Sequence, residues 1–269
     1  MAAMDSRPQV VAHRGASAVK AEHTLAAYVA ALDEGAEALE CDVRLTADGH
    51  LVCVHDRDLR RIAQRRGVVS TMELAQLEEL DFASWKNPWA ELDDEAPDVD
   101  PGSGRVLTLR RLLETVRDYP RPVQLAIETK HPTRYAGLVE RRLVSLLDEF
   151  GWAAPGSPVR VMSFSWVALR RVRRRTPYLP LVFLMDGPSQ WLRSRPISEP
   201  DWIAGPGMQL VRERPELVRR IRAAGTRVHV WTVNEPEDIE LCLELGVEAL
   251  ITDRPGPTLR YLRERAGRV

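Results

Sequence analysis

The chain has 269 residues, of which 44% are hydrophobic and 29% are charged, and its formal net charge at pH 7 is −1. Such a composition is typical of a globular protein, and the length suits one α/β barrel or two small domains. The near-zero charge argues against nucleic acid as the main partner, because proteins that bind its phosphate backbone are usually strongly basic. An anionic small molecule bound by a few local cations stays compatible with it.

Cysteine content and hydrophobic patterning bear on the cellular compartment. The three cysteines are odd in number and lack metal-type spacing, which disfavours a disulfide framework and favours a reducing compartment. Residues 1–9 contain no apolar stretch of the kind found in signal peptides, and no later run has the length of a membrane span. We therefore expect a cytoplasmic protein without a stable membrane anchor, and make no prediction of its oligomeric state.

Short β-rich runs alternate with helical patterns along the chain, as in βα units around a parallel sheet. The expected strands are residues 10–13, 38–46, 123–129, 159–163, 181–185, 202–205, 228–233 and 249–252. Eight such strands close a (β/α)₈ barrel, a fold of about 250 residues. The sequence therefore predicts an α/β fold of the TIM-barrel type, with residues 1–269 as a single domain.

The first helix of the predicted barrel shows a clear apolar periodicity. Leu25, Tyr28, Val29 and Leu32 follow the i, i+3, i+4, i+7 spacing of one helix face, which predicts an amphipathic helix. Gly35 follows them as an expected C-terminal residue of the helix.

A hairpin and an insertion interrupt the βα alternation. Residues 46–49 form a tight-turn sequence, and the strand-like residues 51–55 follow too closely for a helical crossover, so they must return antiparallel. Residues 56–105 are then expected to be an irregular insertion, with an acidic segment near its end. Insertions after barrel strands tend to lie at the catalytic face, which predicts a lid. Its Trp85 and Trp89 could contact an alcohol group or a choline-like cation, or pack beneath the lid.

Carboxylates gather on two of the predicted strands. Glu40 and Asp42 share a strand face, and Glu128 and Lys130 share a face on another strand. Adjacent carboxylates repel one another unless a cation or a shared proton holds them. Three oxygen ligands without cysteine favour Mg²⁺ or Ca²⁺ over zinc, and Mn²⁺ is also compatible. The alternative is a salt-bridge platform, in which Glu40 and Asp42 bind Arg44 or Lys130.

Two histidines are predicted to reach the same end of the barrel. His13, Arg14 and Gly15 end the first strand, and His55 and Asp56 end the return of the hairpin. Histidines, cations and a carboxylate metal site could together cleave a phosphodiester. One imidazole would act as base and the other as acid, while the metal and Arg14 bind the phosphoryl oxygens. Taken singly, each histidine would more often be structural.

Short motifs follow one another in a fixed order along essentially the whole chain. They are His13-Arg14-Gly15, Glu22, Thr24-Leu25, Glu40-Cys41-Asp42-Val43, Thr46-Ala47-Asp48-Gly49, His55-Asp56, Glu128-Thr129-Lys130, Ser163-Phe164-Ser165, Val230-Trp231-Thr232-Val233-Asn234 and Thr252-Asp253-Arg254-Pro255. In identity and order, this set resembles the glycerophosphodiester phosphodiesterase family.

This resemblance implies a barrel enzyme that hydrolyses glycerophosphodiesters, its small-molecule substrates, to glycerol 3-phosphate and an alcohol with Mg²⁺ or Ca²⁺. It also implies roles for ten residues: His13 and His55 as general base and acid, Glu40, Asp42 and Glu128 as metal ligands, Arg14 and Lys130 as phosphate contacts, Phe164 and Trp231 as walls of the substrate site, and Glu22 as a supporting residue. Either the glycerol hydroxyl beside the phosphate, giving a cyclic phosphate, or water could attack first.

The chain departs from the family at one position near the predicted site. The family usually reads Pro-Glu-Asn-Thr where this chain has Ala21-Glu22-His23-Thr24. His23 is therefore an additional imidazole near the barrel mouth. It could contact substrate, but we favour a surface residue in the first turn of the following helix.

Several other polar residues are expected to be structural or exposed. His229 shares a strand face with Trp231 but lies deeper, where a structural role is favoured. His50 and His131 are expected in exposed turns. The basic run of residues 170–175 could attract phosphate or a membrane surface, yet a solvated helix face is favoured.

Two other functions remain compatible with the sequence. Barrel proteins with similar histidine and carboxylate sets act on lipids, so a phospholipase D-like or lyase activity on lysophospholipids is one alternative. An exposed apolar rim would favour it, and the insertion has no obvious apolar loop. A non-catalytic phosphate-binding barrel is the second alternative. It predicts the loss of a histidine or a metal carboxylate, and none is lost.

Overall fold

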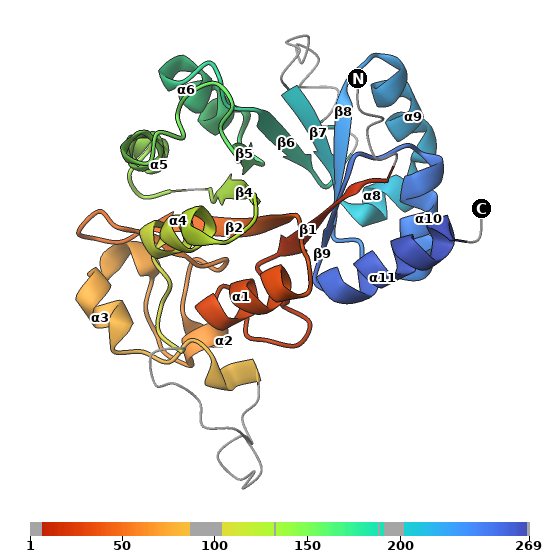
Figure 1. The fold of residues 1–269 in the computed structure, drawn as a ribbon. Helices are drawn as coiled ribbons and strands as arrows, with labels where there is room; N and C mark the ends of the chain where they lie inside the picture. Colours follow the sequence, from red (N-terminus) through yellow and green to blue (C-terminus); the bar gives the residue numbers. More distant parts are fainter. Residues whose placement is uncertain (1–6, 87–103, 132, 188, 191–201, 268–269) are drawn as a thin grey trace, which may run out of the picture.

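The computed structural model describes residues 7–86, 104–131, 133–187, 189–190 and 202–267. Its sheet has the order β1-β9-β8-β7-β6-β5-β4-β2-β3, and β1 also pairs with β2, so that eight parallel strands close into a barrel (Figure 1). These strands are β1 (Gln9–His13), β2 (Ala38–Leu45), β4 (Gln124–Thr129), β5 (Val159–Ser163), β6 (Leu181–Met185), β7 (Trp202–Pro206), β8 (Arg227–Trp231) and β9 (Ala249–Thr252). The predicted TIM barrel is confirmed, and each predicted run overlaps one of the strands.

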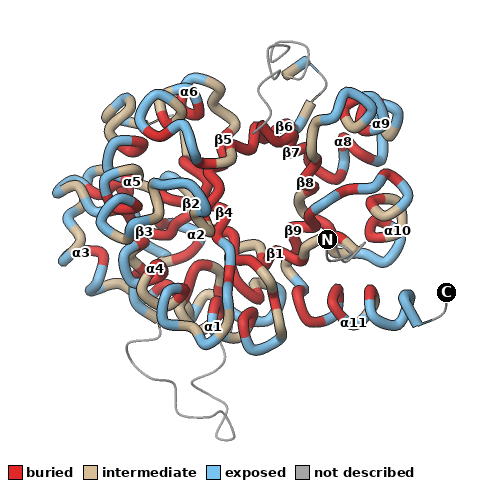
Figure 2. The backbone as a smooth tube through the Cα atoms, turned by 45° about the horizontal axis from the view of Figure 1, so that its top comes forward, coloured by how far each residue is buried: buried red, intermediate tan, exposed pale blue. Residues whose placement is uncertain are grey.

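Helices surround the barrel and cover its outer surface (Figure 1). They are α1 (Leu25–Asp33), α4 (Leu109–Asp118), α5 (Leu138–Glu149), α6 (Trp166–Arg175), α8 (Met208–Glu213), α9 (Pro215–Ala223), α10 (Pro236–Glu244) and α11 (Pro255–Ala266). In Figure 2 the strands are mostly buried, whereas the outward faces of the helices are exposed. A large apolar cluster fills the space between the two layers, as barrel folds require.

The buried face of α1 differs from the one expected. Val29 is 37% exposed, whereas Ala27, Tyr28, Ala31 and Leu32 are buried. The small Ala27 lets the loop after β1 approach closely, because the backbone nitrogen of Ala16 donates to the Ala27 carbonyl at 2.9 Å. The helix is therefore rotated toward its alanines, so that Val29 of the apolar spacing is exposed. Gly35 follows the helix with a φ of 98°, as expected for a C-terminal glycine.

Side chains inside the barrel form layers of different polarity. A separate apolar cluster fills the middle of the barrel: Val11, Ala38, Ala126, Met162, Val182, Leu184, Ile203, Ala249 and Ile251. Two residues further along their strands, His13, Glu40 and Glu128 project toward the carboxyl-terminal mouth. The apolar layer therefore closes the barrel beneath these polar groups. His229 is buried two residues deeper than Trp231, as expected.

The predicted hairpin is also present. Strand β3 (Leu51–Cys53) pairs antiparallel with β2, with Cys53 opposite Val43. The backbone nitrogen of Val54 then donates to the Asp42 carbonyl at 3.0 Å. Because this bond holds the chain beside Asp42, the next residue, His55, lies at the mouth of the barrel.

The insertion after His55 contains short helices where an irregular segment was expected. They are α2 (Arg60–Ala63), η1 (Val69–Thr71), α3 (Leu74–Glu78) and η2 (Ser84–Lys86). An apolar cluster of their own, with Leu59, Leu77 and Phe82 among its members, stabilises them. The ring of Trp85 packs beside this cluster. The Arg61 guanidinium lies over that ring, 5.3 Å from its centroid. Trp89 and the acidic residues 91–100 lie outside the described residues.

Two further expectations concern cysteines and membranes. Cys41, Cys53 and Cys242 are all buried and free, in agreement with the absence of a disulfide framework. Within the described ranges, none of the helices combines the length and the apolar character that a membrane crossing requires.

Candidate active site

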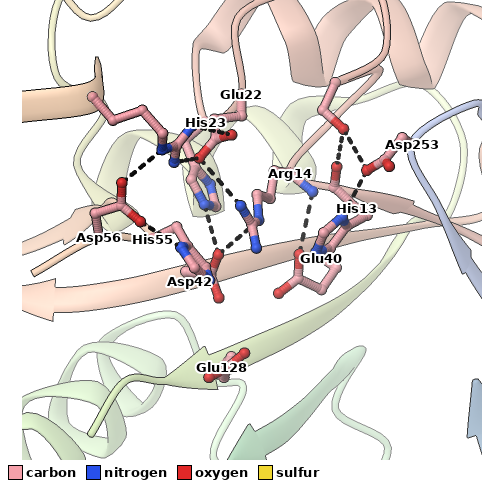
Figure 3. Close-up of polar contacts among 12 residues, drawn as sticks. His13, Arg14, Glu22, His23, Glu40, Asp42, His55, Asp56, Glu128 and Asp253 are labelled. Atoms are coloured by element: carbon pink, nitrogen blue, oxygen red, sulfur yellow. Dashed lines mark hydrogen bonds and ion pairs between the residues drawn. The ribbon is translucent and has the colours of Figure 1, made fainter. Parts of the chain in front are cut away.

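Three carboxylates meet at the mouth of the barrel (Figure 3). Strands β2 and β4 are neighbours, and their register places Asp42 directly opposite Glu128. Glu40 lies two residues deeper in the barrel, on the same face of β2. Each of the three residues is buried and offers an oxygen within 4.8 Å of the other two. The structure thus brings together the carboxylates that the sequence singled out as metal ligands.

Burial and mutual repulsion perturb these carboxylates strongly. Desolvation and the neighbouring Asp42 charge raise the pKa of Glu40 well above its ordinary value, and the same two causes raise the pKa of Glu128 to about 8. Burial would also raise the pKa of Asp42, but Lys130 and Arg14 hold it well below its ordinary value. An ionised form of the whole cluster therefore requires additional positive charge.

The donor set fits a hard divalent cation. All the donors are carboxylate oxygens, which Mg²⁺ and Ca²⁺ prefer. Oδ1 of Asp42 is buried, and its ionic partner is the Lys130 ammonium at 3.1 Å.

Two cations contact the same carboxylates. The Lys130 Nζ atom lies 3.1 Å from Asp42 Oδ1 and 3.0 Å from Glu128 Oε1. The Arg14 Nε atom lies 3.0 Å from Asp42 Oδ2, and the Arg14 backbone nitrogen donates to Glu40 Oε2 at 3.2 Å. The salt bridge to Lys130 that was considered as an alternative therefore exists, whereas Arg44 donates to the His55 carbonyl. Because the three carboxylates outnumber the two cations, the cluster can bind a further positive charge.

His13 is held by a carboxylate from the far end of the sequence. Its Nδ1 atom lies 2.7 Å from Oδ1 of Asp253. The same oxygen accepts a hydrogen bond from Ser17, and Oδ2 of Asp253 accepts one from Asn234. Within the described residues, Nε2 of His13 makes no hydrogen bond. The carboxylate places the proton on Nδ1, so Nε2 is the nitrogen available for proton transfer. Asp253 was predicted only as part of a motif, without a role of its own.

His55 is held in the same way by its neighbour in the sequence. Its Nδ1 atom lies 2.7 Å from Asp56 Oδ1, and Arg61 donates to the other oxygen of Asp56 at 2.7 Å. Two donors of Arg44 fix the His55 carbonyl at 3.0 and 2.7 Å. Burial lowers the pKa of His55. Both histidines therefore have one ring nitrogen bound to an aspartate, and in the described part of the chain the other nitrogen makes no hydrogen bond.

The structure corrects the favoured interpretation of His23. This side chain is only 5% exposed, and its φ of 60° turns the chain inward before the helix begins at Leu25. Its Nε2 atom lies 2.9 Å from Asp42 Oδ2, and its Nδ1 atom lies 2.8 Å from the Tyr28 hydroxyl. His23 is therefore a buried partner of a carboxylate in the candidate metal site, not a surface residue.

Glu22 links the barrel mouth to the insertion. Its carboxylate accepts hydrogen bonds from Arg14 at 3.2 Å and from Arg61 at 2.6 and 3.0 Å. Since Arg61 also binds Asp56, one chain of ion pairs connects Arg14 with the partner of His55 (Figure 3). This arrangement gives Glu22 the supporting contacts that its expected role requires.

An aromatic pair lies beside the polar groups. The rings of Phe164 and Trp231 meet edge to face with their centroids 5.3 Å apart, and both pack on the apolar layer inside the barrel. The indole nitrogen of Trp231 donates to the Gly205 carbonyl at 2.8 Å. The pair therefore forms an apolar surface of defined orientation.

Residues expected outside the site largely stay outside it. His50 is exposed, but His131 is wrongly predicted to be exposed, because its side chain is 17% exposed and lies 3.4 Å from Glu140. Arg170, Arg174 and Arg175 of the basic run are exposed on α6, which agrees with a solvated helix face.

Comparison with known proteins adds to this geometry. A family model described as the glycerophosphoryl diester phosphodiesterase family matches residues 13–257. The chain belongs to this family. It is accordingly a phosphoric diester hydrolase. A Mycobacterium tuberculosis protein named "Probable glycerophosphodiester phosphodiesterase 1" is 49% identical over 96% of this chain and 93% of its own length. The Bacillus subtilis glycerophosphodiester phosphodiesterase is 32% identical over 91% of this chain and 83% of its own.

Solved structures share the barrel. An Agrobacterium tumefaciens glycerophosphodiester phosphodiesterase is 25% identical with a TM-score of 0.70, covering 94% of this chain and 99% of its own. An Oleispira antarctica phosphodiesterase, solved in complex with its product sn-glycerol-3-phosphate, is 24% identical with a TM-score of 0.78, covering 96% and 97%. At 24% identity, the likeness to the Oleispira antarctica structure shows the fold alone.

Proposed function

We propose that this chain hydrolyses glycerophosphodiesters to glycerol 3-phosphate and an alcohol, with a divalent cation bound to Glu40, Asp42 and Glu128. The observation that carries the proposal is the buried carboxylate cluster beside two histidines, each bound by an aspartate. The names of the two relatives support the substrate class. The product complex of the Oleispira antarctica enzyme supports a glycerol 3-phosphate product.

The carboxylate cluster would hold Mg²⁺ or Ca²⁺, and Mn²⁺ is a third candidate, because hard oxygen ligands suit all three ions. When bound, such an ion supplies positive charge that stabilises negative charge on the phosphoryl oxygens. Arg14 and Lys130 enter the same region from the barrel mouth, where their donors would bind the phosphate. Phe164 and Trp231 would pack against the carbon atoms of the glycerol.

The two histidines would divide the proton transfers. With Asp253 at its Nδ1 atom, His13 presents Nε2 as a base that removes a proton from the attacking hydroxyl. His55, with Asp56 at its Nδ1 atom, would donate a proton from Nε2 to the leaving alcohol oxygen. An attacking glycerol hydroxyl and an attacking water both fit this assignment.

We further propose that the chain is a single domain in which residues 56–105 act as a lid.

The test is release of glycerol 3-phosphate from glycerophosphocholine and glycerophosphoethanolamine with Mg²⁺, Ca²⁺, Mn²⁺ or a chelator. We expect release only with metal, and a fall in kcat of about 10²- to 10⁴-fold in His13→Ala and His55→Ala, the usual contribution of an acid or base. Release that survives chelation, or persists in His13→Ala, would contradict the mechanism. Headgroup release from lysophosphatidylcholine without turnover of glycerophosphodiesters would instead favour the lysophospholipase D-like alternative.

A further inference from the structure

A pocket of about 380 Å³ opens beside the carboxylate cluster, between the insertion and the loop after β4. We call it the arginine pocket. It is lined by Arg44, Arg57, Lys130 and Arg134, by the hydroxyl-bearing Ser70, Thr71, Thr133 and Tyr135, and by apolar residues. Lys130 belongs to both the pocket and the carboxylate cluster. Arg44 binds the His55 carbonyl. The pocket is thus joined to the active site by two direct contacts.

The charge of the pocket is one-sided. Its lining contains four cations and no carboxylate. The charge of Lys130 is balanced by Asp42 and Glu128. In the part of the chain that the structure describes, the guanidinium groups of Arg57 and Arg134 have no carboxylate partner, and both residues are exposed to solvent. Their positive charge is therefore available to a ligand.

Under the proposed function, the pocket would receive the leaving alcohol. A general acid protonates the leaving oxygen, so the alcohol departs on the side of the acid. Under the proposed function that acid is His55, and two of the pocket arginines are connected to it along the backbone. Arg44 binds its carbonyl, and Arg57 follows it by two residues. The inference that follows rests on this proposed function.

We propose that the arginine pocket binds the alcohol part of the substrate and selects alcohols that carry a negative charge. Arginines favour a carboxylate or phosphate group and repel a quaternary or primary ammonium. Recognition of a choline-like cation normally uses open aromatic faces. The aromatic side chain in the lining is Tyr135, and the Arg134 guanidinium already lies over its ring at 5.5 Å.

Glycerophosphoserine and glycerophosphoethanolamine provide a matched test, because their alcohols differ by one carboxylate. We expect kcat/KM for glycerophosphoserine to be about tenfold higher, since each exposed arginine contributes a modest attraction. The preference should shrink as salt is raised from about 0.05 to 0.5 M, because the charges are screened. A preference for glycerophosphoethanolamine, or no preference, would overturn the inference while leaving the proposed function intact.

Variants separate the charge of the pocket from the charge of the whole protein. Arg57→Gln and Arg134→Gln should each lower the ratio of the two kcat/KM values about threefold. Arg174→Gln removes the same charge from an exposed position on α6 and should leave the ratio unchanged. A purely structural effect would lower both kcat/KM values equally, and an unchanged ratio in both pocket variants would also overturn the inference. Absence of turnover with either substrate would overturn the proposed function itself.

Discussion

His23 connects the carboxylates of the proposed metal site with the hydrophobic core. Its imidazole bridges Asp42 and the Tyr28 hydroxyl, and Tyr28 also donates to the Glu40 carbonyl at 3.2 Å. Groups that hold a ligand from behind fix its orientation before the metal arrives. His23 is therefore a positioning residue for Asp42, although it departs from the usual family motif.

The prediction for His23 concerns metal affinity. We expect His23→Ala to weaken Ca²⁺ or Mn²⁺ binding about 10- to 100-fold, because Asp42 loses a hydrogen bond that orients it. His23→Asn, with the residue usual in the family, should retain most of the affinity. Isothermal titration with metal is the measurement, and His50→Ala at an exposed turn is the control. Equal affinity in wild type and His23→Ala would show that the hydrogen bond has no positioning role.

Asp253 supports a prediction about acid stability. Burial would raise its pKa, but the hydrogen bonds from His13, Asn234 and Ser17 hold it below the ordinary value. A lowered folded-state pKa stabilises the fold above the unfolded pKa, about 3.9, and this contribution is lost as pH falls further. We expect wild type to exceed Asp253→Asn in free energy of unfolding by about 1 kcal/mol above pH 5, with the difference shrinking below pH 4.

Urea unfolding of both proteins between pH 3 and 7 measures that difference. Asp253→Asn should also lower kcat strongly, because an amide nitrogen facing Nδ1 reverses the tautomer of His13. A stability difference that stays constant down to pH 3 would contradict the assigned role of the carboxylate.

At the level of elements, the turn after β1 depends on a close backbone approach. Gly15 has a φ of 88°, and a Cβ atom there would lie 2.6 Å from the carbonyl carbon of Ala27 in α1. Arg14 beside it also has a positive φ, of 59°. The turn thereby directs the Arg14 backbone nitrogen at the Glu40 carboxylate.

Gly15→Ala should therefore cost more than 2 kcal/mol of folding free energy, since a left-handed backbone penalty of about 1 kcal/mol adds to overpacking against α1. Gly151→Ala is the matched control, because Gly151 has a φ of 70° with nothing within 4 Å of the added Cβ. Its cost should be only about 1 kcal/mol. Urea denaturation compares the two variants, and equal costs would mean that contact with α1 is unimportant.

Over the whole molecule, the two ends of the barrel interior carry different kinds of polar residue. The carboxyl-terminal mouth carries the active-site groups, while Arg160 enters the opposite end from β5 and is only 6% exposed. One of its nitrogens binds Gln9 and Gln124, but Nε and Nη2 have no hydrogen-bond partner among the described residues. Burial and the neighbouring Arg227 lower its pKa to about 10, so it stays charged at neutral pH.

A buried charge without a counterion opposes folding. We expect Arg160→Met to raise the free energy of unfolding by about 1 kcal/mol or more, because the two glutamine amides it leaves are accessible to water. Arg170→Met, at an exposed position on α6, should change it by less than about 0.5 kcal/mol. Thermal and urea unfolding are the measurements. Destabilisation by Arg160→Met would show that the hydrogen bonds to the glutamines outweigh the cost of burying the charge.

Much of this protein was determined by its sequence alone. The strand runs predicted the barrel, and the two-residue period of a strand correctly paired Glu40 with Asp42 and Glu128 with Lys130. The short turn before β3 correctly required an antiparallel return that carries His55 to the mouth. These features are local, because strand direction and turn geometry depend on neighbouring residues.

Other features were decided only by the tertiary structure. Asp253 reaches His13 across 240 positions of sequence because β9 pairs with β1 when the barrel closes. The inward turn of His23 depends on a left-handed backbone that the sequence does not signal at a non-glycine residue. The arginine pocket forms where the insertion meets the loop after β4, segments more than 50 residues apart. Such contacts depend on barrel closure and packing, which no local pattern encodes.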